Sequence, residues 1–78
     1  MITVYAIKNL SRNYIYVGQT VNLEKRLWRH NKGYEKTTKL YRPFVLIHSE
    51  DFENRVLARV EEKYLKSGIG KEFLKSIK

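Results

Sequence analysis

The chain of 78 residues contains no cysteine and only two histidines, which narrows the chemistry it can carry. Without cysteine there are no disulfides, thiolate metal sites or cysteine nucleophiles, and two histidines are too few for a closed structural zinc site. No apolar run exceeds four residues, so no segment is long enough to span a bilayer, and no signal peptide opens the chain. A chain this short supports a single core. We therefore expect one domain over residues 1–78 in a cytoplasmic protein.

Acidic residues are also scarce relative to basic ones. Eight Asp and Glu stand against sixteen Lys and Arg, which leaves a formal net charge of +8. A positive electrostatic field of this size on a small domain favours binding to polyanions. Nucleic acid is the first candidate, and an acidic membrane surface is the second. The basic residues do not gather on one amphipathic helix, so a membrane-surface protein is the weaker interpretation. Charge alone leaves open a solvated, highly soluble surface without a polyanionic partner.

Hydrophobic periodicity predicts three strands and three helices. Side chains alternate in the manner of strands over 1–7 and 14–19, and the polar turn between these segments predicts an antiparallel hairpin. Asn22 is a good N-cap for a helix over 23–31, and Gly33 is a good stop for it. The remaining predictions are a basic loop over 33–43, a central strand over 44–48, and helices over 51–66 and 71–78. The order ββαβαα indicates an α+β fold, a small three-stranded antiparallel sheet flanked by helices.

The longest predicted helix shows apolar residues at four-residue spacing. Phe52, Val56, Val60 and Tyr64 recur in this way, which is a helical period. The segment Ser67–Gly70 follows, and its glycines predict a left-handed cap that ends the helix.

Two tyrosines on neighbouring strands of the hairpin are candidates for catalysis. Tyr5 and Tyr16 each carry a phenol, which accepts a proton near neutral pH when a metal-bound water or cationic neighbours lower its pKa. Aromatic residues on adjacent strands are more often a cross-strand packing pair. The structural interpretation therefore stays open beside the catalytic one.

Arg26 and His30 are spaced i, i+4 and project from one face of the first helix. A guanidinium there can clamp a phosphate and neutralise the charge that develops on it, while an imidazole can carry a proton. The alternative is a solvated basic face, because Lys25, Arg29 and Lys32 lie close by along the same helix.

Glu61 and Glu62 offer carboxylates late in the longest helix. Mg²⁺ often takes only one or two protein oxygens and keeps several waters, so a single glutamate is a sufficient anchor. On a helical wheel Glu61 falls between Leu57 and Leu65, whereas Glu62 lies beside Ala58, whose small side chain leaves room for an ion. Spacing alone does not choose between the two glutamates. A surface ion pair with a neighbouring lysine is the more common role for such a residue.

Taken in order, the motifs of this chain cover almost its whole length. Thr3-Val4-Tyr5 comes first and Tyr16-Val17-Gly18 second. The series continues with Gly18-Gln19-Thr20, Asn22-Leu23-Glu24-Lys25-Arg26-Leu27, His30-Asn31-Lys32-Gly33, Thr38, Arg42-Pro43-Phe44, Ala58 and the segment from Glu62 to Gly68. This ordered set resembles the GIY-YIG nuclease superfamily, and most of all its minimal single-domain bacterial members.

The resemblance implies a fold of three strands flanked by helices and hydrolysis of a phosphodiester bond with one divalent metal ion, Mg²⁺ or Mn²⁺. By the same resemblance Tyr5 is the base or positions the water, Tyr16 assists it, and Gly18 lets substrate or backbone approach. The chain departs from the signatures at Thr3, which replaces a glycine, and at Val17, which replaces an isoleucine. Neither departure removes a tyrosine.

The other catalytic residues that the resemblance implies lie on the helices. Arg26 matches the helix arginine and His30 the histidine one turn later, both set to neutralise charge on the phosphate. Glu62 matches the metal-binding glutamate, so the choice between Glu61 and Glu62 rests on analogy.

DNA is the partner that the resemblance implies, and no membrane partner is expected. Sequence-independent contacts with the DNA backbone are expected from four basic residues in and near the loop: Arg29, Lys36, Lys39 and Arg42. A domain this small offers little surface for base readout, so we expect structure-specific or weakly specific cutting, with a homodimer or a partner subunit adding specificity. The alternative is a catalytically weak module of the same fold that binds branched or damaged nucleic acid.

Overall fold

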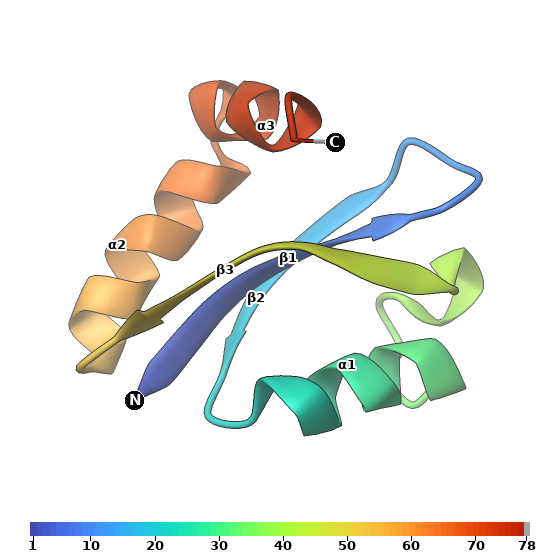
Figure 1. The fold of residues 1–78 in the computed structure, drawn as a ribbon, viewed down its shortest axis with the longest axis horizontal. Helices are drawn as coiled ribbons and strands as arrows, with labels where there is room; N and C mark the ends of the chain where they lie inside the picture. The colour runs from blue at the N-terminus through green and yellow to red at the C-terminus, as the bar shows by residue number, and fades with distance from the viewer. Residues whose placement is uncertain (78) are drawn as a thin grey trace.

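The computed structural model describes residues 1–77, which form a three-stranded antiparallel sheet with helices on both faces (Figure 1). The elements follow the expected order: β1 (Ile2–Asn9), β2 (Ile15–Thr20), α1 (Leu23–Lys32), the 3₁₀ helix η1 (Lys39–Tyr41), β3 (Phe44–Phe52), α2 (Arg55–Lys66) and α3 (Gly68–Lys75). The predicted α+β class and the ββαβαα order are confirmed. The central strand is β1, with β2 and β3 at the edges, so the prediction of a central third strand is wrong.

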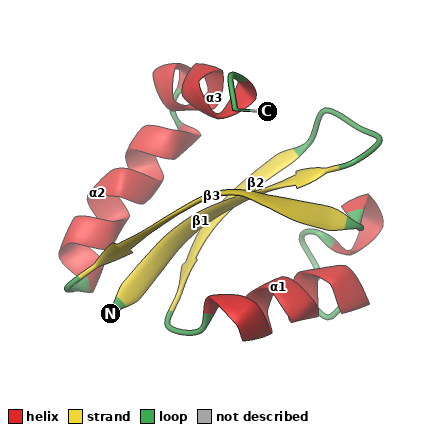
Figure 2. Ribbon diagram, in the orientation of Figure 1, coloured by secondary structure: helices red, strands yellow, loops and turns green. Residues whose placement is uncertain are grey.

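One face of the sheet packs against α2 and α3 (Figure 2). Its buried side chains come from β1, β2 and both helices: Ile2, Val4, Ala6, Val17, Ala58, Leu65 and Leu74. On α2 only Ala58 and Leu65 are buried, because the helix approaches the sheet through its smallest side chain. Val56 and Val60 consequently face away from the sheet and are 72% and 65% exposed.

The opposite face of the sheet carries α1. Tyr5, Ile7 and Phe44 are buried there, and Leu23 and Leu27 of α1 pack against them. Residues of β1 therefore alternate between the two faces, as the sequence pattern predicts.

Both ends of α1 are capped as the sequence predicts. The side chain of Asn22 accepts a hydrogen bond of 3.0 Å from the backbone N–H of Lys25. Gly33 adopts a left-handed conformation, with φ of 83°, and its N–H bonds to the last carbonyls of the helix. These caps fix the direction in which α1 presents its side chains.

The junction of β3 and α2 differs from the prediction. β3 continues to Phe52, and Glu50 and Asp51 pair with β1 although they are polar. An edge strand tolerates such residues because solvent reaches them, so the apolar pattern underestimates its length. The helix then begins at Arg55, where the side chain of Asn54 accepts a hydrogen bond of 3.0 Å from Leu57 N–H.

The predicted left-handed glycine cap between α2 and α3 is also wrong. Gly33 is the only residue of positive φ in residues 1–77. Ser67 ends α2 and caps α3, which begins at Gly68 and ends at Lys75. Gly70 is needed for close packing, since a Cβ there would lie 1.9 Å from the carbonyl oxygen of Tyr64. The final residue of the predicted third helix, Lys78, lies outside the described residues.

The loop between α1 and β3 holds η1 and the extended residue Arg42, whose φ of −69° and ψ of 157° are as expected before a proline. Within residues 1–77, no helix combines the length and apolar character needed to cross a membrane.

Candidate active site

A buried hydrogen-bond chain runs from β1 through α1 to the loop that follows. The hydroxyl of Tyr5 lies 2.8 Å from Nε2 of His30, and Nδ1 of His30 lies 2.7 Å from the hydroxyl of Thr38. The three residues are 0%, 1% and 0% exposed. Both imidazole nitrogens therefore have partners, and the ring is held from two sides.

Burial sets the protonation of this chain. It raises the pKa of Tyr5 above its ordinary value, and the neighbouring Tyr16 acts in the same direction. Burial lowers the pKa of His30, assisted by Arg26 and Arg29 and opposed by Glu35. At neutral pH a neutral phenol thus lies beside a neutral imidazole. With the ring proton on Nδ1, directed at Thr38, Nε2 is free to accept from the phenol.

Gly18 on β2 lies opposite Tyr5 in the register of the sheet. A Cβ at this position would lie 2.9 Å from the hydroxyl of Tyr5 and 3.0 Å from Cε2 of Tyr16. The two tyrosine rings are 6.3 Å apart between centroids, and Tyr16 is half-buried. The glycine therefore leaves room for the rings of Tyr5 and Tyr16 above it, and Gly18 itself is buried beneath them.

Arg26 reaches the same region from α1. Its Nη1 lies 2.5 Å from Oε2 of Glu35, and its Nη2 lies 3.5 Å from the backbone oxygen of Gln19. Burial disfavours the charge, but Tyr5 and Glu35 together keep the pKa of Arg26 above its ordinary value. Its Nε is buried and has no hydrogen-bond partner within residues 1–77. One donor of the guanidinium is thus unused.

Glu62 comes from α2, on the other side of the sheet. Its Oε1 accepts a hydrogen bond of 2.7 Å from the side-chain amide of Gln19, and its Oε2 accepts one of 2.9 Å from Nζ of Lys66. Burial alone would raise the pKa of Glu62, but the bonds from Lys66 and Gln19 hold it below its ordinary value. The carboxylate is therefore ionised at neutral pH.

Gln19 joins the two sides of the site. It follows Gly18 on the edge strand β2, and it bonds Arg26 through its backbone and Glu62 through its side chain. Of the five residues predicted as catalytic, Tyr5, Tyr16 and His30 are in mutual ring contact, and Arg26 and Glu62 share Gln19 as a partner. The structure thus places all five around β2, with Tyr5, Tyr16, Arg26 and His30 on the α1 face of the sheet and Glu62 on the α2 face.

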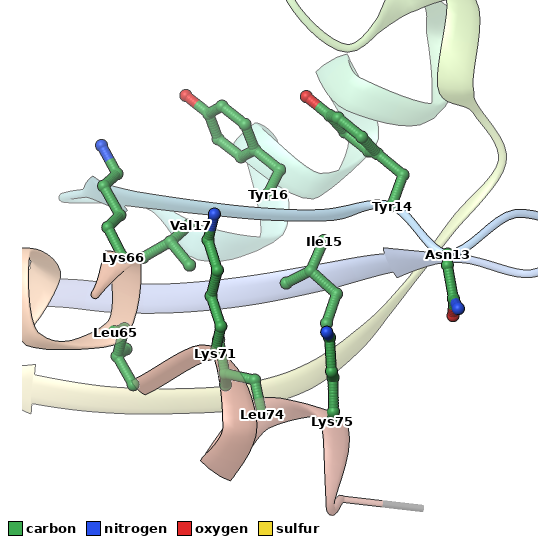
Figure 3. Close-up of a pocket in the computed structure, with 10 residues that line it drawn as sticks. All are labelled: Asn13, Tyr14, Ile15, Tyr16, Val17, Leu65, Lys66, Lys71, Leu74 and Lys75. Carbon is green, nitrogen blue, oxygen red and sulfur yellow. The ribbon is translucent and has the colours of Figure 1, made fainter. Parts of the chain in front are cut away.

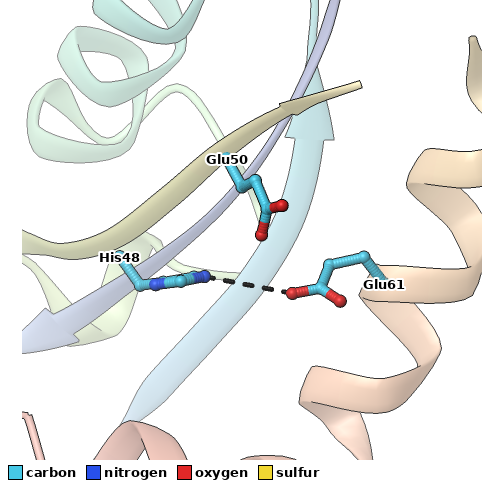
Figure 4. A group of neighbouring side chains, drawn as sticks. All are labelled: His48, Glu50 and Glu61. Carbon is cyan, nitrogen blue, oxygen red and sulfur yellow. Dashed lines mark ion pairs between the residues drawn. The ribbon is translucent and has the colours of Figure 1, made fainter. Parts of the chain in front are cut away.

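Glu61 points elsewhere. Its Oε2 lies 4.0 Å from Nε2 of His48, and together with Glu50 these residues offer ligand atoms that all lie within 4.8 Å of one another (Figure 4). The backbone of α2 therefore separates the two adjacent glutamates, which residue spacing alone does not distinguish. Glu62 turns toward Gln19, and Glu61 turns toward β3.

A family model described as the GIY-YIG catalytic domain matches residues 1–72. The chain belongs to the GIY-YIG family. It is 41% identical over 68 residues to a UPF0213 protein of Pediococcus acidilactici, covering 82% of this chain and 68% of that relative. It is 37% identical over 75 residues to a UPF0213 protein of Staphylococcus haemolyticus, covering 95% and 90%. No solved structure matches it.

Membership in the GIY-YIG family places the chain among nucleases, which act on DNA and generally depend on a divalent metal ion. The names of its UPF0213 relatives state no activity. The chemistry of Glu62 fits such an ion, because a single ionised carboxylate is a common anchor for Mg²⁺. The ammonium of Lys66 already compensates this negative charge at 2.9 Å.

The basic residues that we predicted to contact DNA differ in how they are held. Arg29 lies 3.4 Å from Glu35 with its guanidinium over the ring of Tyr34, and Arg42 donates to the carbonyl of Lys39. Lys36 and Lys39 are exposed, and neither forms an ion pair with a carboxylate of residues 1–77. Their ammonium groups are consequently the freer pair in this loop of the GIY-YIG domain.

Sequence reasoning missed three residues that organise the site. Gln19 and Thr38 lie within the segments that carry the family resemblance, but no periodicity or charge pattern singles them out as partners of Glu62 and His30. Glu35 does carry a signal, because it is the single acidic residue in the basic segment 33–43. Such a lone carboxylate would be expected to pair with the arginines beside it.

Proposed function

We propose that this GIY-YIG domain, residues 1–78, is a divalent-metal-dependent endonuclease that hydrolyses DNA phosphodiester bonds with structure-specific or weakly sequence-specific preference. The observation that supports it is the meeting of Tyr5, Arg26 and Glu62, from three separate elements, around Gly18 and Gln19. A proton acceptor, a fixed cation and a metal-binding carboxylate are the groups that hydrolysis of a phosphodiester requires. Because the curated relatives are bacterial, we propose that it acts on DNA in the cytoplasm, where a homodimer or a partner subunit adds specificity.

Tyr5 and His30 act together in this proposal. The attacking water gives a proton to the phenolic oxygen of Tyr5 while the phenol gives its own proton to Nε2 of His30, so no free phenolate has to form. The lowered pKa of His30 keeps Nε2 unprotonated at neutral pH. Thr38 accepts the Nδ1–H bond and stabilises the imidazolium that results. Tyr16, half-buried beside the phenol, orients the water.

Arg26 neutralises charge on the phosphate. Its donors for phosphate oxygens are the unused Nε and, once it exchanges Glu35 for the substrate, Nη1. Glu62 would hold Mg²⁺ or Mn²⁺, which when bound supplies Lewis-acid polarisation of the phosphate and stabilises the leaving 3′ oxygen. Lys66, which now bonds Oε2 of Glu62, would give up that oxygen to the ion and remain close to the substrate.

Cleavage of supercoiled plasmid and of flapped and four-way DNA, with Mg²⁺ or Mn²⁺, tests the proposal. The variants to compare are Glu62→Gln and Glu61→Gln, which change the same charge at adjacent positions of one helix. We expect Glu62→Gln to cut at least about 100-fold more slowly, as is typical when a charge-stabilising group is lost. Glu61→Gln should cut as wild type does, because its carboxylate faces His48. Equal rates for Glu62→Gln and wild type would remove Glu62 from the mechanism.

A DNA-binding module without useful catalysis is the second candidate. The complete burial of Tyr5 favours it, as does the fact that both oxygens of Glu62 already have partners. This candidate predicts that wild type binds branched DNA in a gel-shift assay and leaves all of the same substrates intact with either metal.

A further inference from the structure

A groove lies along the outer edge of β2, between this strand and α3 (Figure 3). Its volume is about 480 Å³, within the range of about 300–1,000 Å³ typical of sites that hold a small molecule. Apolar side chains of β2, α2 and α3 form its floor: Ile15, Val17, Leu65 and Leu74. We call this space the β2–α3 groove. Of the residues used in the proposed catalytic mechanism, it shares only Tyr16 and Lys66.

The charge along the β2–α3 groove has one sign. Lys66, Lys71 and Lys75 line it, and none of its lining residues is acidic. Lys66 is paired with Glu62, but Lys71 and Lys75 are exposed and form no ion pair with a side-chain carboxylate of residues 1–77. Figure 3 shows both of these side chains extending from α3 toward β2. An apolar floor with unpaired ammonium groups above it suits a chain of phosphates joined by sugars and bases.

The β2–α3 groove is continuous with the candidate active site. Lys66 lines the groove and bonds to Glu62, and Tyr16 lines it and contacts the ring of Tyr5. From these residues the groove extends along β2 toward Asn13 at the hairpin turn (Figure 3). If the scissile phosphate of a substrate lies near Glu62, the nucleotides next to it therefore lie in the groove.

We propose that the β2–α3 groove binds a single-stranded segment of nucleic acid that adjoins the scissile phosphate, with Lys71 and Lys75 contacting its phosphates. This inference rests on the proposed nuclease function, and it specifies the substrate class as DNA with an unpaired strand beside the cut. A duplex does not fit a space of about 480 Å³, because each nucleotide would bring its paired base and the second backbone with it. The apolar floor of the groove, formed by Ile15, Val17, Leu65 and Leu74, offers a surface against which unpaired bases can be buried.

Binding of a fluorescein-labelled 12-nucleotide single strand, followed by anisotropy in EDTA so that no cleavage occurs, tests the inference. The test variant is Lys71→Gln/Lys75→Gln. The control is Lys25→Gln/Lys63→Gln, which loses the same charge from exposed positions that do not line the groove. Thermal melting of all three proteins verifies that they are folded.

We expect the groove variant to bind the single strand at least about tenfold more weakly than the control variant at moderate salt. The slope of log K against log salt should fall by about 1.4 relative to wild type, since each single-strand phosphate that is no longer neutralised lowers it by about 0.7. Binding of a blunt duplex should change equally in both variants. If the groove variant binds the single strand as tightly as the control and with the same slope, the inference is wrong. Wild type that binds acidic peptides and no oligonucleotide would also overturn it.

The two proposals fail in different ways in these experiments. If wild type cuts nothing but the groove variant still loses single-strand binding, the groove inference stands and the catalytic proposal falls. If Glu62→Gln abolishes cutting while the groove variant binds normally and cuts flapped DNA as the control does, catalysis stands and the groove inference falls.

Discussion

At the scale of single residues, the surroundings of Tyr5 determine what its phenol can do. A surface tyrosine exchanges its proton with water, but Tyr5 has no exposed surface and its pKa is raised by burial. The hydroxyl therefore keeps its proton in the resting protein. Its only hydrogen-bond partner among residues 1–77 is His30, which makes the imidazole the acceptor through which any base function of the phenol must act.

The neutral state of His30 predicts a pH-dependent stability. Because burial holds the pKa of His30 below the unfolded value of about 6.5, the unfolded chain binds more protons than the folded one as the pH falls past that value. The stability contributed by neutral His30 is complete above the unfolded pKa and is lost as the pH falls toward the folded one. We expect the Tm of wild type to decline from pH 7 to pH 5.5, measured by circular dichroism.

The matched variants for this prediction are His30→Gln and His48→Gln. The first should show a flatter profile of Tm against pH, and the second should keep the decline because His30 remains. For a domain of this size each kcal/mol shifts Tm by about 4–8 °C, so the difference is measurable. Parallel profiles for wild type and His30→Gln would show that His30 does not titrate with unfolding.

The candidate catalytic residues could be chosen from the sequence, but the contacts between them could not. Tyr5, Arg26 and Glu62 stand in segments that resemble family motifs, so their types and order make them candidates. That Gln19 bonds to both Arg26 and Glu62 depends on how α1 and α2 meet the same edge strand from opposite faces. No local sequence pattern predicts these two hydrogen bonds, because they result from packing between elements that are far apart in the chain.

At the scale of elements, α2 shows why a helical pattern does not by itself reveal the buried face. The four-residue spacing of Val56, Val60 and Tyr64 predicts the helix, yet these side chains are largely exposed and the buried contacts come from Ala58 and Leu65. The position of α2 follows from a small residue that allows close approach to the sheet. This position also turns Glu62, and not Glu61, toward β2.

The contact between α2 and α3 predicts opposite effects for two glycines of one helix. At Gly70 a Cβ would overlap the carbonyl of Tyr64 and lie 2.5 Å from Cα of Leu65, so Gly70→Ala must displace backbone. At Gly68 no atom lies within 4 Å of an added Cβ. We expect Gly70→Ala to lower the free energy of unfolding by about 1–3 kcal/mol, the usual cost of overpacking.

Gly68→Ala is the control for this prediction. It should leave the free energy of unfolding unchanged or raise it by up to about 1 kcal/mol, because alanine favours helix and limits the unfolded chain. Urea denaturation followed by circular dichroism measures both variants. Equal stabilities for the two alanine variants would mean that α3 does not pack on α2 as described.

At the scale of the whole molecule, four exposed lysines that contribute to the net charge of +8 form two separate pairs. Lys71 and Lys75 lie along the β2–α3 groove, whereas Lys36 and Lys39 project from the loop after α1. Composition predicts the affinity for polyanions but not this division, which arises because α1 and α3 lie on opposite faces of the sheet. The two pairs of lysines are therefore able to contact different parts of one DNA substrate.

The loop lysines predict an effect on duplex binding that the groove lysines do not share. Lys36→Gln/Lys39→Gln removes the two freest ammonium groups of the loop, and the salt slope falls by about 0.9 for each B-DNA phosphate that the protein ceases to neutralise. We expect this variant to bind a blunt duplex more weakly than the Lys25→Gln/Lys63→Gln control, with a slope smaller by about 1.8, and to bind a short single strand as the control does. Anisotropy titrations over a range of salt concentrations measure both quantities. A duplex slope equal to that of the control would exclude the loop from the DNA path and leave the β2–α3 groove as the main basic surface beside Glu62.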